Sequence, residues 1–188
     1  MLAGQHPERL LDIALDALSN ESDWRTILDE LPVPIYTTDP HGAVTYWNSA
    51  CIELAGRVPQ LGQDRWCVTW RIYTTNGDFM PHAECPMAET IKNREEVRGK
   101  VAIALRPDGS RVAFCPYPTP LFDTHGNLTG AINMLVDVTD EQVGALNEQA
   151  ERCRRLADST YNREMSGILT EMAAEYDRTA EDLAKKRH

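Results

Sequence analysis

Residues 97–139 read VRGKVAIALRPDGSRVAFCPYPTPLFDTHGNLTGAINMLVDVT. Two turn sequences divide this stretch, RPDG at residues 106–109 and DTHGN at residues 123–127. Proline presets a turn φ and glycine supplies the positive φ that a tight turn needs. The segments between the turns are rich in Val, Ile, Ala, Phe and Leu, as half-buried strands are. The stretch therefore predicts a meander of three antiparallel strands.

Both faces of this meander are apolar. Successive side chains of a strand point to opposite faces. The last strand thus directs Ala131, Asn133 and Leu135 to one face, and Ile132, Met134 and Val136 to the other. A sheet with one face in water would instead alternate apolar with polar residues. We expect a helix from elsewhere in the chain, or from a partner chain, to cover the second face.

Amphipathic helices are predicted on both sides of this region. Residues 7–19 carry an apolar stripe that includes Leu11, Leu15 and Leu18, and residues 23–30 form a second short helix. After residue 139 the apolar residues follow a heptad-like spacing that starts at Val143 and Leu146. Residues 160–162 (TYN) interrupt or kink this long helix.

The middle of the chain is less uniform. Residues 35–39 and 43–48 predict a hairpin, and residues 49–56 a short helix that ends at a glycine. Residues 57–81 are the least regular part and contain Trp66, Trp70 and Tyr73. A helix follows over residues 83–93, with Met87 and Ile91 facing inward.

Composition limits the partners. The 188 residues include 29 acidic and 19 basic side chains, a formal charge of −10. Such a balance disfavours nucleic acid and anionic membrane surfaces, both of which need a positive patch. No apolar run approaches the roughly 18 residues of a membrane span, and no signal-peptide pattern opens the chain. We therefore expect a cytoplasmic protein whose five scattered cysteines are reduced thiols.

The order of these elements resembles the PAS domain family. The matching residues are YTTD-x-x-G (36–42), YWNSA (46–50), LRPDG (105–109), PLFD-x-x-G (120–126), and GAIN with DVT (130–133 and 137–139). The resemblance implies an α+β fold: a five-stranded antiparallel sheet in the order 2-1-5-4-3, with short helices on one face, plus flanking helices. We accordingly expect N-terminal amphipathic helices at 1–29, a PAS domain at 30–141 and a helical or coiled-coil extension at 142–188.

The resemblance also implies a sensory, signal-transduction module without enzyme activity, and neither catalytic motifs nor a convincing acid–base pair is present in the sequence. We expect a homodimer that also binds a protein partner, with signal leaving the domain at Asp137 and Thr139. The predicted dimer or partner surface consists of Leu11, Leu15, Leu18, Ile132, Met134, Val143 and Leu146. An alternative is an accessory subunit that docks a histidine kinase.

A ligand in the PAS cavity is the other alternative, as a small metabolite or haem; a domain with no cofactor is the leading expectation. The predicted ligand-binding residues are Trp47, Trp66, Trp70, Tyr73, His82, Met87, Ile91 and Asn133. Imidazole is a good iron ligand, so His82 is the candidate for haem. The basic side chains expected for haem propionates are missing, however, and Cys67 lacks the Asn-Cys-Arg context of the flavin-binding branch. His82-x-x-Cys85 alone is too small a set for a metal site.

Overall fold

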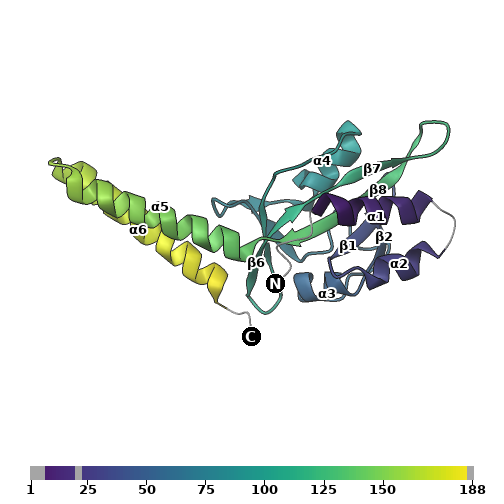
Figure 1. The fold of residues 1–188 in the computed structure, drawn as a ribbon, viewed down its shortest axis with the longest axis horizontal. Coiled ribbons are helices and arrows are strands. Elements are labelled where there is room, and N and C mark those ends of the chain that lie inside the picture. Colours follow the sequence, from purple (N-terminus) through teal and green to yellow (C-terminus); the bar gives the residue numbers. More distant parts are fainter. Residues whose placement is uncertain (1–6, 20–22, 186–188) are drawn as a thin grey trace.

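The computed structural model describes residues 7–19 and 23–185, which form an α+β fold with helices on both faces of one sheet (Figure 1). The helices are α1 (Pro7–Ser19), α2 (Trp24–Glu30), α3 (Ala50–Ala55), α4 (Pro86–Asn93), α5 (Thr139–Ser159) and α6 (Arg163–Ala184), with a 3₁₀ turn, η1, at His82–Glu84. The strands are β1 (Ile35–Thr38), β2 (Val44–Trp47), β3 (Arg71–Tyr73), β4 (Phe79–Met80), β5 (Ala102–Leu105), β6 (Arg111–Pro116), β7 (Thr119–Phe122) and β8 (Leu128–Asp137).

The predicted strand order 2-1-5-4-3 is confirmed as β2-β1-β8-β6-β5. The sheet also continues past β5 into β3 and β4, so the expectation of an irregular segment was wrong for these two short strands. The backbone hydrogen bond from Thr74 to the carbonyl of Asp78 closes the turn between them at 2.8 Å. Ile72 is buried in the core, and this burial stabilises the short strand β3 although the surrounding sequence shows no strand-like alternation.

The middle strand of the meander is two strands, β6 and β7, rather than one. Both predicted turns are present, with Arg106 and Asp123 each accepting a backbone hydrogen bond from the turn glycine at 3.0 Å. Pro116 and Pro118 flank Tyr117, and a proline has no backbone N–H to donate to a sheet. The break at residues 117–118 follows from these two missing donors. It lets β6 pair with one end of β8 and β7 with the other.

The inner face of the sheet is covered by α3 and α4. Its core contains Ala131 and Leu135 of β8, with Leu54 of α3 and Met87 and Ile91 of α4. The helix predicted over residues 83–93 begins later, because extended Cys85 separates the 3₁₀ turn from α4, which has a proline in its first turn.

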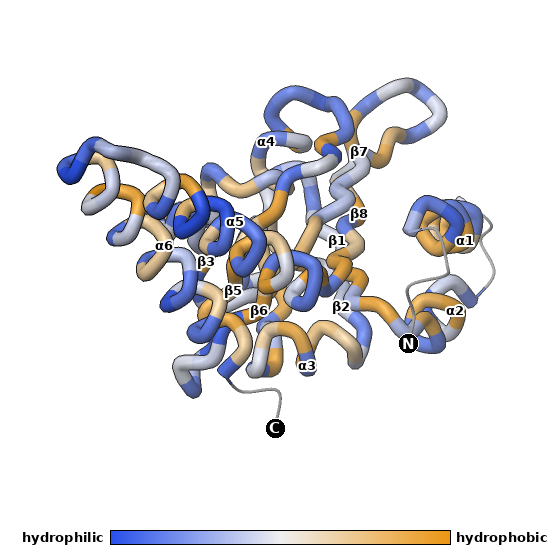
Figure 2. The backbone as a smooth tube through the Cα atoms, turned by 60° about the vertical axis from the view of Figure 1, so that its left-hand side comes forward, coloured by the Kyte–Doolittle hydropathy of each residue, from blue (hydrophilic) through white to orange (hydrophobic). Residues whose placement is uncertain are grey.

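The outer face is covered twice by the chain itself. Helices α1 and α2 pack on Ile35, Ile132 and Met134, while α5 and α6 pack at their base on Ile103 and Ala113. Figure 2 shows the two helix pairs at separate places along the sheet. The expected cover is thus confirmed, and it comes from within one chain. All residues of the predicted dimer surface lie in these two clusters, namely Leu11, Leu15, Leu18, Ile132, Met134, Val143 and Leu146.

The C-terminal region folds into two antiparallel helices that form a hairpin projecting away from the sheet (Figure 1). The interruption predicted at residues 160–162 is the turn between them. Asn162 caps α6, because its side-chain oxygen accepts hydrogen bonds from the backbone N–H groups of Glu164 and Met165. Among the described helices, none is both long and apolar enough to span a bilayer.

Candidate functional site

A buried polar network centred on Tyr36 crosses the inner face of the sheet. The Tyr36 side chain is fully buried, and its hydroxyl donates to the Trp66 carbonyl at 2.8 Å. The same hydroxyl accepts a hydrogen bond from Asn133 Nδ2 at 3.0 Å. Asn133 Oδ1 in turn accepts the backbone N–H of Tyr117 at 3.0 Å. The network therefore joins β1, β8, the β6–β7 break and the loop before β3.

The break between β6 and β7, at Tyr117, explains why a polar side chain occupies position 133 of the core strand β8. The N–H of Tyr117 is shared between Asn133 Oδ1 and the carbonyl of Met134, at 3.0 and 2.8 Å. An amide side chain buried in a core strand needs such partners, since an unpaired buried polar group is costly. Asn133 thus links the interrupted strand to the buried hydroxyl of Tyr36.

The Trp66 carbonyl reaches this network because the residue adopts a left-handed backbone conformation, with φ of 68°. Non-glycine residues rarely hold such a φ without support from their surroundings. The Trp66 ring supplies part of that support by packing on Gly42. A Cβ at Gly42 would lie only 2.2 Å from Trp66 Cε3. In addition, the Trp66 N–H donates to the Gly42 carbonyl at 2.7 Å.

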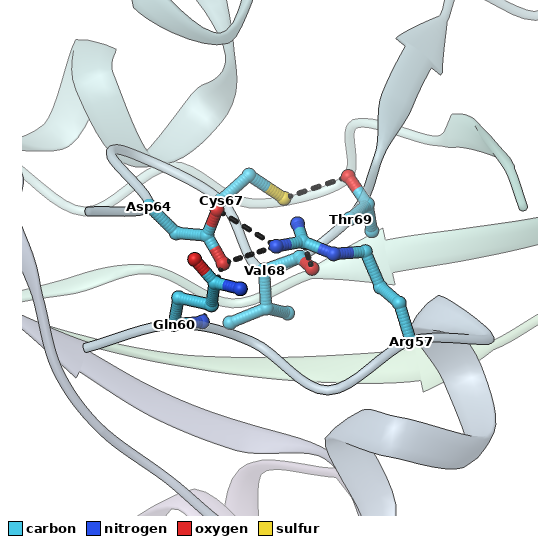
Figure 3. Close-up of polar contacts among 6 residues, drawn as sticks. All are labelled: Arg57, Gln60, Asp64, Cys67, Val68 and Thr69. Carbon is cyan, nitrogen blue, oxygen red and sulfur yellow. Dashed lines mark hydrogen bonds and ion pairs between the residues drawn. The ribbon is translucent and has the colours of Figure 1, made fainter. Parts of the chain in front are cut away.

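An ion pair braces the same loop. Arg57 Nη2 contacts both carboxylate oxygens of Asp64, at 2.9 and 2.6 Å, and Arg57 Nη1 donates to the Val68 carbonyl at 3.3 Å (Figure 3). Asp64 also accepts the backbone N–H of Gln60 at 2.7 Å. One guanidinium nitrogen thus binds Asp64 while the other binds the carbonyl of Val68, so the charged group links the residues on both sides of Trp66.

Three thiols surround the network, and burial keeps them protonated. Burial raises the pKa of Cys51 and of Cys85 to about 12, and it also raises the pKa of Cys67. The Cys67 thiol lies 3.1 Å from Thr69 Oγ1 (Figure 3). A thiol is nucleophilic only as thiolate, so these groups act as small core side chains at neutral pH.

The junction between the sheet and α5 is a second polar cluster. Thr139 Oγ1 donates to Asp137 Oδ1 at 2.6 Å and accepts the backbone N–H of Ala113 at 3.1 Å. The Thr139 N–H also donates to Asp137 Oδ1, at 2.9 Å. Because Val138 donates to the Ala113 carbonyl at 2.9 Å, the end of β8 and the first turn of α5 are both fastened to β6. Asp137 and Thr139 are thus brought together, and their role in signal exit stays a prediction.

The structure brings most of the predicted ligand-binding residues together, but not all of them. Trp47, Trp66, Met87 and Ile91 join the inner core, and Asn133 belongs to the network. Tyr73 instead packs in the cluster on the outer face, and Trp70 is 42% exposed beneath the Arg71 guanidinium.

Sequence reasoning missed two parts of the site. One is Tyr36, because Ile35 and Tyr36 are both large and apolar and alternation alone does not say which of them faces inward. The other is the Arg57–Asp64 pair, for which residues 57–64 carry no local signal.

Several buried polar atoms have no hydrogen-bond partner within the described part of the chain. They are Trp47 Nε1, His82 Nε2, Thr90 Oγ1 and Thr38 Oγ1. Burial lowers the pKa of His82, so its imidazole is favoured in the neutral form. Polar atoms of this kind usually bind ordered water or a ligand.

These residues do not fit haem or a flavin nucleotide. Both groups carry acidic substituents that need cationic partners, yet no charged side chain is buried among the described residues. Two guanidinium groups lie next to the inner core. That of Arg57 is paired with Asp64, and that of Arg106 donates to the main-chain carbonyls of Glu53 and Leu54. His82 lies near this same ion pair. Within residues 7–19 and 23–185, no group of three His, Cys, Asp or Glu side chains is placed to hold a metal ion.

The sheet order and the helix that leaves β8 are those that the resemblance in the sequence implied, and the sequence comparison agrees. Residues 32–140 match the PAS domain family, so the chain belongs to that family. No curated protein shows significant sequence similarity to the chain.

The similar solved structures include LOV proteins and PAS domains. An RNA-binding light-oxygen-voltage (LOV) receptor has a TM-score of 0.50 and 22% identity over 81% of this chain, which spans 41% of that receptor. The LOV domain of a blue-light-activated histidine kinase from Erythrobacter litoralis has a TM-score of 0.44 and 20% identity, over 58% of this chain and 98% of that one. The PAS domain of a fruit-fly potassium channel has a TM-score of 0.49 and 14% identity, over 66% and 96%. At 22% identity the likeness to the receptor concerns the fold.

Proposed function

We propose that this protein is a non-catalytic PAS signalling module that passes the state of its inner polar network to the α5–α6 hairpin. It acts through self-association and protein partners. The observation that carries the proposal is the position of two side chains on β8. Asn133 bonds to the buried Tyr36 hydroxyl, and Asp137, four residues on, holds the first turn of α5.

Strand β8 is suited to this role because it pairs with β1, β7 and β6. A change in the hydrogen bonds of Asn133 would alter the pairing of Tyr117 at the β6–β7 break. From that break, the pairing of β6 with β8 runs from Pro116–Leu135 to Phe114–Asp137. The last of these pairs is adjacent in sequence to Ala113, which donates to Thr139. A small shift in the network is thereby converted into a change in how firmly α5 is held.

Hydrogen exchange tests this coupling. Tyr36→Phe removes the hydroxyl that joins Trp66 and Asn133, so we expect faster amide exchange both in β8 and in the first turns of α5. The matched control is Tyr46→Phe, because the Tyr46 hydroxyl donates to Asp29 at 2.6 Å and lies under α2. That control should loosen α2 and leave α5 unchanged. If Tyr36→Phe loosens β8 but leaves α5 as protected as in the wild type, the proposal fails.

A second candidate function is the sensing of a small polar molecule in the inner core. The unpartnered buried atoms of Trp47, His82 and Thr90 favour it. A neutral molecule with several hydrogen-bonding groups suits these donors and acceptors better than a charged one. Mass spectrometry of the denatured, untagged protein, with an absorption spectrum beforehand, would detect a copurified molecule. Recovery of protein alone, with the absorption of tryptophan and tyrosine only, would favour the module without a ligand.

A further inference from the structure

The distal half of the α5–α6 hairpin carries large apolar side chains that remain exposed. Figure 1 shows this half standing clear of the sheet. The exposed fractions are 47% for Leu156, 50% for Met165 and Ile168, and 39% for Met172, and Tyr161 in the turn is fully exposed. Soluble proteins rarely leave several large apolar residues next to one another on one surface without a partner.

These side chains share one face of the hairpin. On α6 the residues that pack against α5 include Leu169, Ala173 and Tyr176. Each residue of a helix advances by about 100°, which places Met165, Ile168 and Met172 together on one side of that seam. Because α5 runs in the opposite direction, Leu156 falls on the same side of the pair. We call Leu156, Met165, Ile168 and Met172 the distal face.

Opposite charges border the distal face. Arg152, one turn before Leu156, lies at its α5 edge, and Glu175, one turn after Met172, lies at its α6 edge. The ion pair between Arg154 and Asp177 fixes the level of α5 relative to α6. With a rise of about 1.5 Å per residue, Arg152 and Glu175 stand at the same height to within about one helical turn.

We propose that the distal face binds the same face of a second copy, so that two hairpins form a four-helix bundle. A two-fold axis parallel to the hairpin would lay α5 of one copy over α6 of the other. That operation exchanges the two edges, so Arg152 meets the partner's Glu175 on both sides of the bundle. A surface that supplies both an apolar strip and its own complementary charges is suited to self-association.

This surface differs from the one expected from the sequence. The residues of that expected surface pack within the chain, whereas the distal face is exposed. The inference rests on the proposed function, in which the hairpin is the output element. A change in how α5 is held at Thr139 would then alter the angle at which the two hairpins meet.

The test is the molar mass of the full chain by light scattering and sedimentation over a concentration series. We expect the wild type to form a species of twice the 21.1 kDa protomer. Ile168→Glu places a charge in the centre of the apolar strip and should weaken the dimer by at least about a hundredfold. Ala174→Glu is the matched control, since Ala174 is exposed on the other side of α6, and it should leave the dimer intact.

Charge exchange tests the arrangement itself. Arg152→Glu should weaken the dimer about three- to tenfold, as expected for a pair at the edge of an interface, and adding Glu175→Arg should restore it. Circular dichroism confirms that each variant keeps its helices. A monomeric wild type, or a dimer that Ile168→Glu leaves unchanged, would overturn the inference.

Failure here can be told apart from failure of the proposed function. If Tyr36→Phe still loosens α5 in the monomeric Ile168→Glu variant, the coupling stands on its own. If another protein proves to occupy the distal face while the chain stays monomeric, the coupling again stands and the second copy is refuted.

Discussion

Replacing Thr139 by valine tests the junction between the sheet and α5 with almost no change in side-chain volume. Thr139 is 4% exposed, and its hydroxyl is the acceptor for the N–H of Ala113, which is itself fully buried. Valine keeps the shape but leaves that N–H without a partner. A buried donor left unpaired costs about 1–3 kcal/mol. Asp137 loses one donor but keeps the Thr139 N–H, so its share of the loss is small.

We therefore expect Thr139→Val to lower the free energy of unfolding by about 2 kcal/mol. Urea denaturation followed by circular dichroism measures this change, and exchange of the Ala113 amide reports whether the loss is local to the junction. Thr139→Ser keeps the hydroxyl and serves as the control, with a smaller loss from its missing methyl group. If the valine variant is as stable as the serine variant to within about 0.5 kcal/mol, the hydroxyl does not hold the junction and this reasoning is refuted.

Two further predictions concern the core. Gly42→Ala should cost more than about 2 kcal/mol, because its Cβ would overlap the Trp66 ring at a φ of 84°. Gly77→Ala, at a φ of 89° with open space around it, should cost only about 1 kcal/mol, and equal losses in urea denaturation would contradict the packing argument. Alkaline pH should destabilise the protein. In the unfolded chain the thiols of Cys51 and Cys85 ionise near pH 9, while the folded state keeps both protons to about pH 12. Between these limits the free energy of unfolding should fall by about 1.4 kcal/mol per pH unit for each thiol, and Cys85→Ala should remove one share of that slope. If Cys85→Ala leaves the pH dependence of the free energy of unfolding unchanged, the buried thiol does not cause the alkaline loss of stability.

Most of the sheet could be predicted because burial there follows a period of two. Ala131 and Leu135 face the inner core while Ile132 and Met134 face α1, as the alternation requires. The turns were predictable for a similar reason, since proline and glycine restrict the backbone locally. The alternation and the turn residues are both local signals, and the folded structure contains the strands and turns that they predict.

The split of the middle strand and the course of the C-terminal helices depend on non-local choices. Pro116 and Pro118 indicate in the sequence that two backbone N–H donors are missing. Only the position of Asn133 in the fold shows how the gap in the strand pairing is filled. The stripe from Val143 to Ala157 fits a partner helix of any origin. Which helix packs there depends on the turn at residues 160–162, whose return brings Ala173 and Ala180 of the same chain into contact with it.

Asn133 could be singled out from the sequence, but the rest of the inner network could not, because one of its acceptors is the main-chain carbonyl of Trp66. The identity of residue 66 does not indicate that its backbone is left-handed, or that its carbonyl accepts a hydrogen bond from the Tyr36 hydroxyl. That geometry exists because Gly42 admits the ring and the Arg57–Asp64 pair braces the loop. Part of the support comes from Gly42, which lies 24 residues before Trp66, so it appears only once the chain is folded. Under the proposed function, a shift of this loop would alter the hydrogen bond that the Tyr36 hydroxyl donates, and through that hydroxyl the one that Asn133 donates.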